Sequence, residues 1–175
     1  MIENERNTTI KAALEVARRM MTAARTAPKA KGMDRLELSC VSGDDLEILA
    51  KKMEEIGLKN QRASFARDAG NIRQSQAVVL LGSRKGEQEL NCGYCGFPTC
   101  AEKRQNLVVP CVFPVTDLGI ALGSACAVAA DCRVDNRVMY TAGMAALELG
   151  WLKECFYALS IPLSITGKSP YFDRK

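Results

Sequence analysis

The chain has 175 residues, of which 47% are hydrophobic and 25% charged, the balance of a soluble globular domain rather than of a disordered chain. It contains no histidine, so His-based catalytic triads and imidazole metal ligands are excluded, and a metal must be held by thiolates or carboxylates. The net charge of +4 comes from 24 basic and 20 acidic residues spread along the chain, which gives no indication of nucleic-acid binding.

The eight cysteines point to a reducing compartment, where thiols serve metals or redox chemistry more often than disulfides. Residues 1–11 are polar and lack the apolar core of a secretory signal, so we expect a cytoplasmic protein. The stretch 107–130 is long and apolar, but it contains Pro110, Pro114 and Asp117. We therefore expect a buried helix there rather than a membrane span.

In the first half of the chain, apolar residues at helical spacing predict an amphipathic helix over residues 8–27, which Pro28 ends. Alternating apolar residues over 36–41 predict a half-buried strand that places Cys40 in the core. Further patterns predict a helix over 45–57, a polar helical stretch to residue 70, and a strand covered on both faces at 77–81.

Residues 82–114 have no sustained period, and a loop this long in a compact domain is expected only where something organises it. A helix follows over 115–131, in which Gly119 and Gly123 would let another backbone approach closely. A helix at 137–149 and a strand at 155–165 complete the pattern. The order predicts one α+β (α/β-like) domain over residues 1–175, with 82–114 as an inserted cysteine-rich loop.

Cys92, Cys95 and Cys100 fall within nine residues, and ten residues separate Cys100 from Cys111. Four thiolates at this spacing can converge on one site, as an iron–sulfur cluster requires. The two glycines between them suit a backbone that must approach the cluster closely. Because the cluster with its thiolates is anionic, nearby basic residues would lower its electrostatic cost: Arg84, Lys85, Lys103 and Arg104.

Zinc also accepts four thiolates, so it is the alternative metal. Tetrathiolate zinc ribbons usually have two separated Cys-x-x-Cys pairs, whereas this chain has one, at Cys92 and Cys95, which favours iron–sulfur. Cys111 is the favoured fourth ligand, because its proline-flanked segment can bend without breaking a helix. Cys126 and Cys132 fall in or at the end of an Ala-rich helix, where small buried thiols are common.

The segment Cys-Gly-Tyr-Cys-Gly-Phe-Pro-Thr-Cys at 92–100 resembles the iron–sulfur segment of the corrinoid protein in CO dehydrogenase/acetyl-CoA synthase complexes. A wider set of segments resembles an uncharacterised family described as containing a ferredoxin domain: residues 23–32, 117–125, 135–140 and 161–168. That resemblance covers nearly all of the chain. It implies a cluster, of the 4Fe-4S type, on the same four cysteines, and it leaves the activity open.

Residues 23–53 resemble nitroreductases, flavin enzymes in which a helix ending Ala-Ala-x-x-Ala-Pro leads into a strand and a second helix. This resemblance implies a nitroreductase-like sheet packed by helices and makes FMN a candidate cofactor. The Arg-rich motif that this family uses for the flavin phosphate is absent before the first helix. The small apolar faces of the first helix and of the helix with Gly119 and Gly123 predict a homodimer.

An anionic cofactor such as FMN would bind in a cleft between the Pro28 loop and the C-terminal strand, with Lys29, Lys31 and Lys168 supplying positive charge. Asp117 is expected as a helix cap or first-turn carboxylate rather than a catalytic group. Two functions agree with these features. One is an electron-transfer protein or oxidoreductase with a redox partner, and the other is a non-catalytic module in which an iron–sulfur or zinc site is structural.

Overall fold

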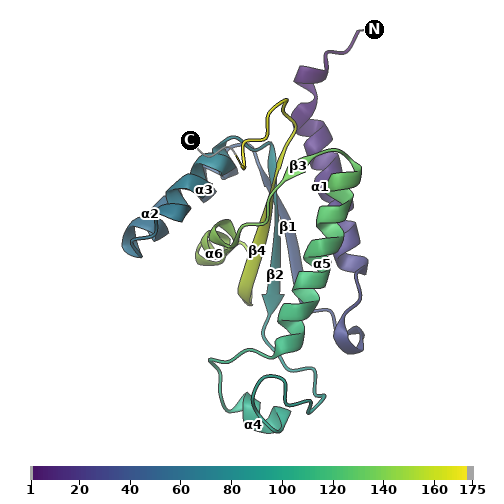
Figure 1. Cartoon of the computed structure of the whole chain (residues 1–175), viewed down its shortest axis with the longest axis vertical. Helices are drawn as coiled ribbons and strands as arrows, with labels where there is room; N and C mark the ends of the chain where they lie inside the picture. The colour runs from purple at the N-terminus through teal and green to yellow at the C-terminus, as the bar shows by residue number, and fades with distance from the viewer. Residues whose placement is uncertain (1, 173–175) are drawn as a thin grey trace.

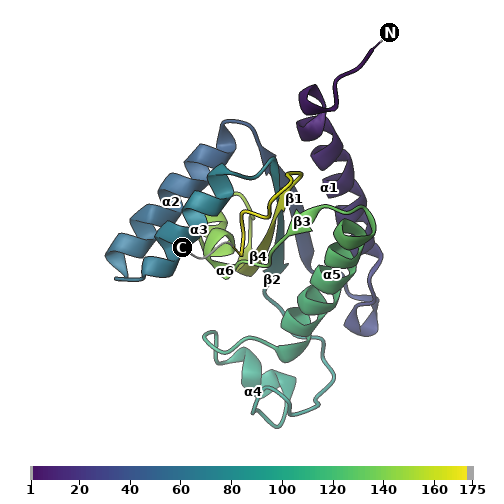
Figure 2. The same cartoon turned by 45° about the horizontal axis from the view of Figure 1, so that its top comes forward.

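The computed structural model describes residues 2–172. A four-stranded antiparallel sheet with the order β1-β2-β4-β3 forms its centre. The strands are β1 (Leu36–Ser42), β2 (Ala77–Arg84), β3 (Asp135–Asn136) and β4 (Cys155–Ser164). One face of the sheet is covered by α1 (Thr9–Thr26) and α5 (Val112–Asp131), and the other by α2 (Asp45–Lys59), α3 (Ala63–Arg73) and α6 (Tyr140–Glu148) (Figure 1, Figure 2).

The predicted periodicities are confirmed in the elements that build the core. In α1, the side chains of Ala13, Ala17, Met20 and Ala24 are fully buried on one face, and the helix ends just before Pro28. The apolar run of β2 lies at the centre of the sheet and is buried on both sides, as predicted. Two apolar clusters result, one under α1 and α5 and one under α2, α3 and α6.

Several boundaries differ from the predicted ones. β2 continues to Arg84, so the irregular loop begins at Lys85, and α5 begins at Val112 rather than at Val115. Pro114 fits into the first turn of α5 because the backbone N–H groups there have no partner within the helix. The last helix begins at Tyr140 rather than at residue 137, because Met139 is extended and pairs with Ser160 of β4. The short strand β3, just before this segment, was not predicted from the sequence.

α5 is the one helix in residues 2–172 that is long and apolar enough to cross a membrane by length and composition. In the structure it packs along α1 and against the sheet, as a core helix does. Within residues 2–172 the predicted close approach at Gly119 and Gly123 is not made, since no described atom lies within 4 Å of a Cβ built at either position.

The two ends of the sheet carry different features. Leu36 of β1 pairs with Ser83 at one end, where the cysteine loop leaves β2 for α5. At the other end, Ala77 pairs with Leu163, and the chain leaves β4 toward the C-terminus. Figure 1 shows the cysteine loop with the short helix α4 (Cys100–Arg104) below the sheet, and the segment after β4 above it.

Candidate functional site

The start of the cysteine loop is held by one arginine. The Arg35 guanidinium donates to the carbonyl oxygens of Lys85 (3.3 Å) and Glu87 (3.0 Å) and to Gln88 Oε1 (3.5 Å). Gly86 lies against this guanidinium with φ +149°, and a Cβ there would stand 2.2 Å from Arg35 Nη1. Only glycine therefore lets the loop backbone approach Arg35 this closely.

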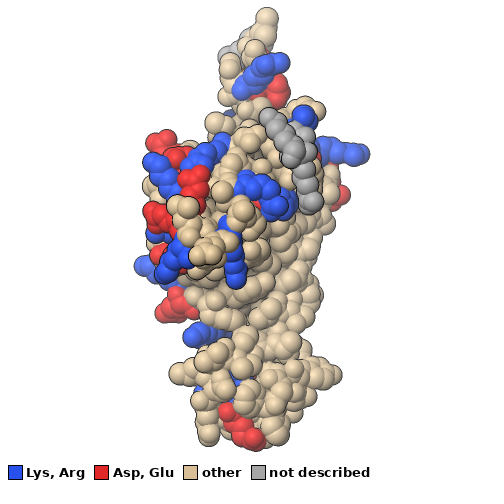
Figure 3. Space-filling model, turned by 60° about the vertical axis from the view of Figure 1, so that its left-hand side comes forward, with Lys and Arg blue, Asp and Glu red and all other residues tan. Residues whose placement is uncertain are grey.

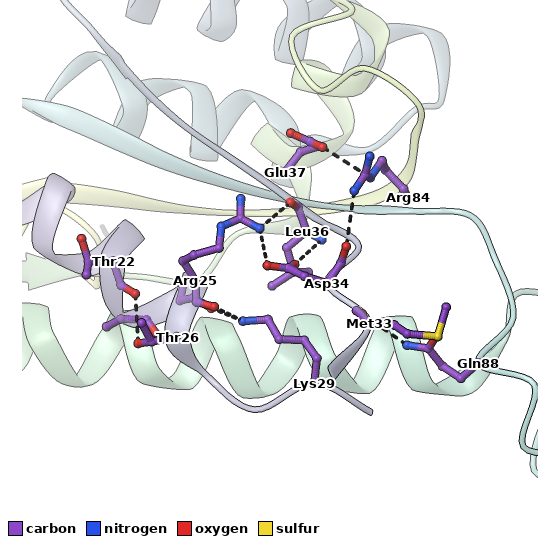
Figure 4. A network of polar contacts seen from close by, with 12 residues as sticks. Thr22, Arg25, Thr26, Lys29, Met33, Asp34, Leu36, Glu37, Arg84 and Gln88 are labelled. Atoms are coloured by element: carbon purple, nitrogen blue, oxygen red, sulfur yellow. Dashed lines mark hydrogen bonds and ion pairs between the residues drawn. The ribbon is translucent and has the colours of Figure 1, made fainter. Parts of the chain in front are cut away.

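Gln88 connects the start of the cysteine loop to the protein interior. Its side chain is fully buried, and its amide nitrogen donates to Asp117 Oδ2 (3.4 Å) and to the Met33 carbonyl oxygen (3.5 Å) (Figure 4). Asp117, buried in the second turn of α5, also accepts a hydrogen bond from the Ala30 backbone N–H (3.0 Å). Asp117 is thus a link between loops rather than the predicted cap or first-turn carboxylate.

The four cysteines predicted to bind a cluster line one cavity. Cys92, Cys95 and Cys100 are half-buried, and Cys111, which is 7% exposed, is the N-cap residue of α5. The cavity measures about 10 Å³, room for about one water molecule. Within residues 2–172, no group of three or more Cys, Asp or Glu side chains stands in metal-binding geometry.

The donor set nevertheless fits an iron–sulfur cluster in its chemistry, because four thiols from one loop and one helix start face the same cavity. All eight cysteines are free. A bound cluster would require the loop to widen around it, since the cavity has no room for one as it stands. Cys126 and Cys132 pack instead against the apolar cluster under α1 and α5, and Cys40 lies there too, as predicted.

The loop backbone is shaped by turns between the cysteines. Gly93 and Gly96 have φ of +73° and +86°, and the Gly96 N–H donates to the Gly93 carbonyl oxygen (2.9 Å). Asn91 Oδ1 accepts from the backbone N–H of Cys100 (2.8 Å), which ties the two ends of the motif together. The Tyr94 ring, 6.3 Å from that of Phe113, connects the motif to the first turn of α5.

Two charged residues also line the cysteine cavity, Glu87 and Lys103. Lys103 is 6% exposed, and its ammonium lies 2.8 Å from Glu87 Oε1. Arg104 donates to Glu87 Oε2 (3.4 Å) from the exposed side. The hydrogen bond from Lys103 and, less strongly, that from Arg104 hold the pKa of Glu87 below its ordinary value. Sequence reasoning named both cations but missed their carboxylate partner.

An open groove of about 690 Å³ adjoins this cavity. Glu87, Lys103 and Cys111 line both spaces, so these residues form the wall between them. The rest of the groove combines basic and apolar side chains, among them Lys85, Arg104, Leu107, Val108 and Phe156. Leu107 and Val108 are 75% and 91% exposed.

The three lysines predicted to bind an anionic cofactor are not brought together within the chain. Lys29 and Lys31 lie near the start of β1, at the cysteine-loop end of the sheet, whereas Lys168 follows β4 at the opposite end. The Lys29 ammonium donates to the carbonyl oxygens of Ala24 and Arg25 at the end of α1 (Figure 4), and burial lowers its pKa. Lys29 is therefore engaged with the helix end.

A second pocket, of about 650 Å³, lies at the Lys168 end of the sheet. Arg6 and Arg133 line it, and neither guanidinium makes an ion pair among the described residues. Hydroxyl groups and acids complete the lining, from Thr9, Ser164 and Thr166 and from Glu5 and Asp135. We call this the anion pocket. No sequence signal identified it, because its residues come from three separate segments.

The charged surface is uneven. On the face shown in Figure 3, Lys, Arg, Asp and Glu gather over the upper part, which includes α2 and α3, and the lower part is mostly uncharged. Arg73 of α3 forms ion pairs with Glu47 and Glu54 of α2. The surface therefore shows mixed charges and no continuous basic patch on this face.

A family model described as "Uncharacterized protein containing a ferredoxin domain" matches residues 108–174. An uncharacterized protein of Archaeoglobus fulgidus is 46% identical over 164 residues, which cover 89% of this chain and 88% of that protein. The chain belongs to this ferredoxin-domain family. The resemblance seen in the sequence is thereby confirmed.

Solved structures confirm the nitroreductase-like fold. A Desulfitobacterium hafniense nitroreductase with bound FMN is 14% identical with a TM-score of 0.58, covering 91% of this chain and 82% of that one. A BluB-like flavoprotein of Clostridium difficile is 18% identical with a TM-score of 0.54, covering 92% and 84%. At these identities the likeness establishes the fold. Together with the family description, it supports a redox role in general terms.

Proposed function

We propose that the protein transfers electrons through a 4Fe-4S cluster held by Cys92, Cys95, Cys100 and Cys111. One observation carries the proposal: of the eight cysteines, these four line the same cavity. A bound cluster would supply one-electron chemistry. The chain's own contribution is to anchor the loop through Arg35 and to hold Cys111 at the rigid start of α5.

The open groove is the proposed side of approach for a redox partner or substrate. Its wall includes Cys111, one of the four proposed ligands, and its opposite side is solvent. Exposed Leu107 and Val108 offer an apolar contact there, and Lys85 offers a positive charge. Glu87, Lys103 and Cys111 would separate a bound cluster from a partner in the groove.

Anaerobic purification followed by iron, sulfide and zinc analysis tests the proposal. We expect a brown protein with iron and sulfide in equal amounts, bleached by dithionite. Cys111→Ser should lose or convert the cluster, whereas Cys126→Ser should keep its absorbance and electron paramagnetic resonance spectrum, because Cys126 packs in the core. A colourless protein with stoichiometric zinc would instead identify a structural metal module.

FMN is the second cofactor we propose, and the anion pocket is its phosphate site. Two guanidinium groups and three hydroxyl groups line the pocket beside the carboxylates of Glu5 and Asp135. The guanidinium and hydroxyl donors suit a phosphate. Lys168 follows directly after the lining residue Gly167, so one of the three predicted lysines stays in this proposal. Flavin binding by the Desulfitobacterium hafniense relative in fold is consistent with it.

Two variants distinguish the anion pocket from the predicted Pro28 cleft. Arg6→Gln should weaken binding of added FMN, measured by flavin fluorescence at tens of micromolar, while Lys31→Asn should leave it unchanged. The opposite pattern would favour the cleft. A protein that neither carries nor binds FMN would remove the flavin proposal and leave the cluster proposal standing.

We also propose a homodimer in a reducing, cytoplasmic compartment. The outward face of α5 is uncharged and exposed, from Gly119 and Ile120 to Gly123 and Ala127, and Ile10 of α1 is 57% exposed. Small residues allow a second helix to approach closely. Light scattering should give the mass of two chains, and Gly123→Glu should give the mass of one.

A further inference from the structure

The Glu87–Lys103 ion pair stands out in the cysteine cavity, because these are the two charged residues among its lining. The side chains of Lys103 and Glu87 are 8% and 13% exposed. Removing two such charges from water costs several kcal/mol per ion, and well-packed apolar residues in their place are often no less stable. Stability alone therefore does not account for a buried lysine beside four thiols.

We propose that the Glu87–Lys103 pair sets the reduction potential of the cluster, an inference that rests on the proposed function. Reduction adds one electron, and hence one negative charge, to the cavity. The Lys103 ammonium stabilises that charge, and the Glu87 carboxylate opposes it. Both act strongly because they line the same cavity as the thiols and their side chains are 8% and 13% exposed, so water screens them little.

Neighbouring contacts hold the pair in place. Lys103 lies on α4, whose first turn is capped by Thr99, with Thr99 Oγ1 accepting from the Glu102 N–H (3.2 Å). The Glu87 carbonyl oxygen is fixed by Arg35, so the two charges belong to separately anchored segments. Arg104 bonds Glu87 from the exposed side, where its side chain is 54% exposed and solvent weakens its effect on the cavity.

Anaerobic potentiometric titration of the cluster-loaded protein, followed by electron paramagnetic resonance, tests the inference. Lys103→Met should shift the midpoint potential downward, and Glu87→Gln should shift it upward. Lys103→Arg keeps the charge and should stay near the wild-type potential. Arg104→Met, on the exposed side, should shift it less than Lys103→Met does. Opposite shifts from the two partners of one ion pair identify an electrostatic role, because structural damage would not reverse its sign.

The double variant Lys103→Met with Glu87→Gln provides a second measurement if a single variant loses its cluster. The pair contributes no net charge in this variant, as in the wild type, and the potential should return toward the wild-type value. Iron content and the melting temperature of each variant are measured alongside. Iron-loaded variants whose potentials match the wild type, or shift in one direction, would overturn this inference alone. A wild-type chain without iron and sulfide would overturn the proposed function and the inference together.

Discussion

The sheet core and the cysteine loop are ordered by different forces. In the core, β2 contributes a run of fully buried apolar side chains: Val78, Val79, Leu80 and Leu81. In residues 85–111, the buried side chains are Gln88, Lys103 and Cys111, of which two are polar. The core is therefore held by apolar burial, whereas the loop is held by hydrogen bonds, ion pairs and the proposed ligand of its thiols.

Because different forces hold them, the two regions can lose their structure separately. Local opening costs least free energy where few apolar contacts are broken, so the loop should open while the sheet stays folded. A cluster bound by four loop thiols would remove that freedom. Substitutions confined to one region are thus a direct way to test how far the two are independent.

The largest expected effect is in the core, at Gly143 of α6. A Cβ at this position would stand 2.2 Å from the carbonyl oxygen and 2.6 Å from the carbonyl carbon of Ala158 in β4. The obstacle is strand backbone, which cannot turn aside, so Gly143→Ala must push α6 off the sheet. We expect a loss of about 3 kcal/mol in the free energy of unfolding, or roughly 6–12 °C in melting temperature.

Gly70→Ala is the matched control for this change. Gly70 lies in α3 with nothing within 4 Å of a built Cβ, so alanine should raise stability slightly through its helix propensity. Equal destabilisation by both substitutions would show that the close approach of α6 and β4 does not limit stability.

A smaller effect is expected at the loop anchor. Gly86→Ala would displace the Arg35 guanidinium and break its hydrogen bonds to the Lys85 and Glu87 carbonyl oxygens. The free energy of global unfolding should fall by about 1 kcal/mol or less, since few apolar contacts change. Hydrogen exchange of residues 85–91 should nevertheless become much faster in the cluster-free protein. Loss of the whole fold would show that the loop and the core are one cooperative unit.

The sequence predicts the core well because its signals are periodic. Ala13, Ala17 and Met20 mark the buried face of α1 at helical spacing, and the apolar run of β2 marks a strand covered on both faces. The cysteine motif likewise predicts which four thiols share a cavity, because a proline-flanked Cys111 was already distinguishable from thiols on a continuous helix.

Other features depend on partners far apart in the sequence. Glu87 meets Lys103 across the loop, and Asp117 meets Ala30 across the fold, with no local pattern to reveal either contact. The anion pocket gathers residues from both ends of the chain. Strand β3 has two residues, too few for an alternating pattern. Lys29 lies in a basic stretch of sequence, and no local pattern indicates that its ammonium donates to backbone carbonyls of α1.

The smallest expected effect concerns the reactivity of a thiol in the sheet. Cys155 begins β4 beside Leu152, and burial, with a lesser contribution from Glu37, raises the pKa of its thiol from 9.0 to about 11. At pH 8, this lowers the thiolate fraction about 100-fold relative to the unfolded chain, and iodoacetamide reacts with the thiolate. Mass spectrometry should therefore show Cys155 alkylated about 100-fold more slowly in the native protein than in urea. Between pH 9 and 11 the unfolded chain releases this proton before the folded chain does, so stability should fall as the pH rises, and Cys155→Ala should reduce that slope. Equal alkylation rates in the native and unfolded states would show that the start of β4 opens as readily as the loop.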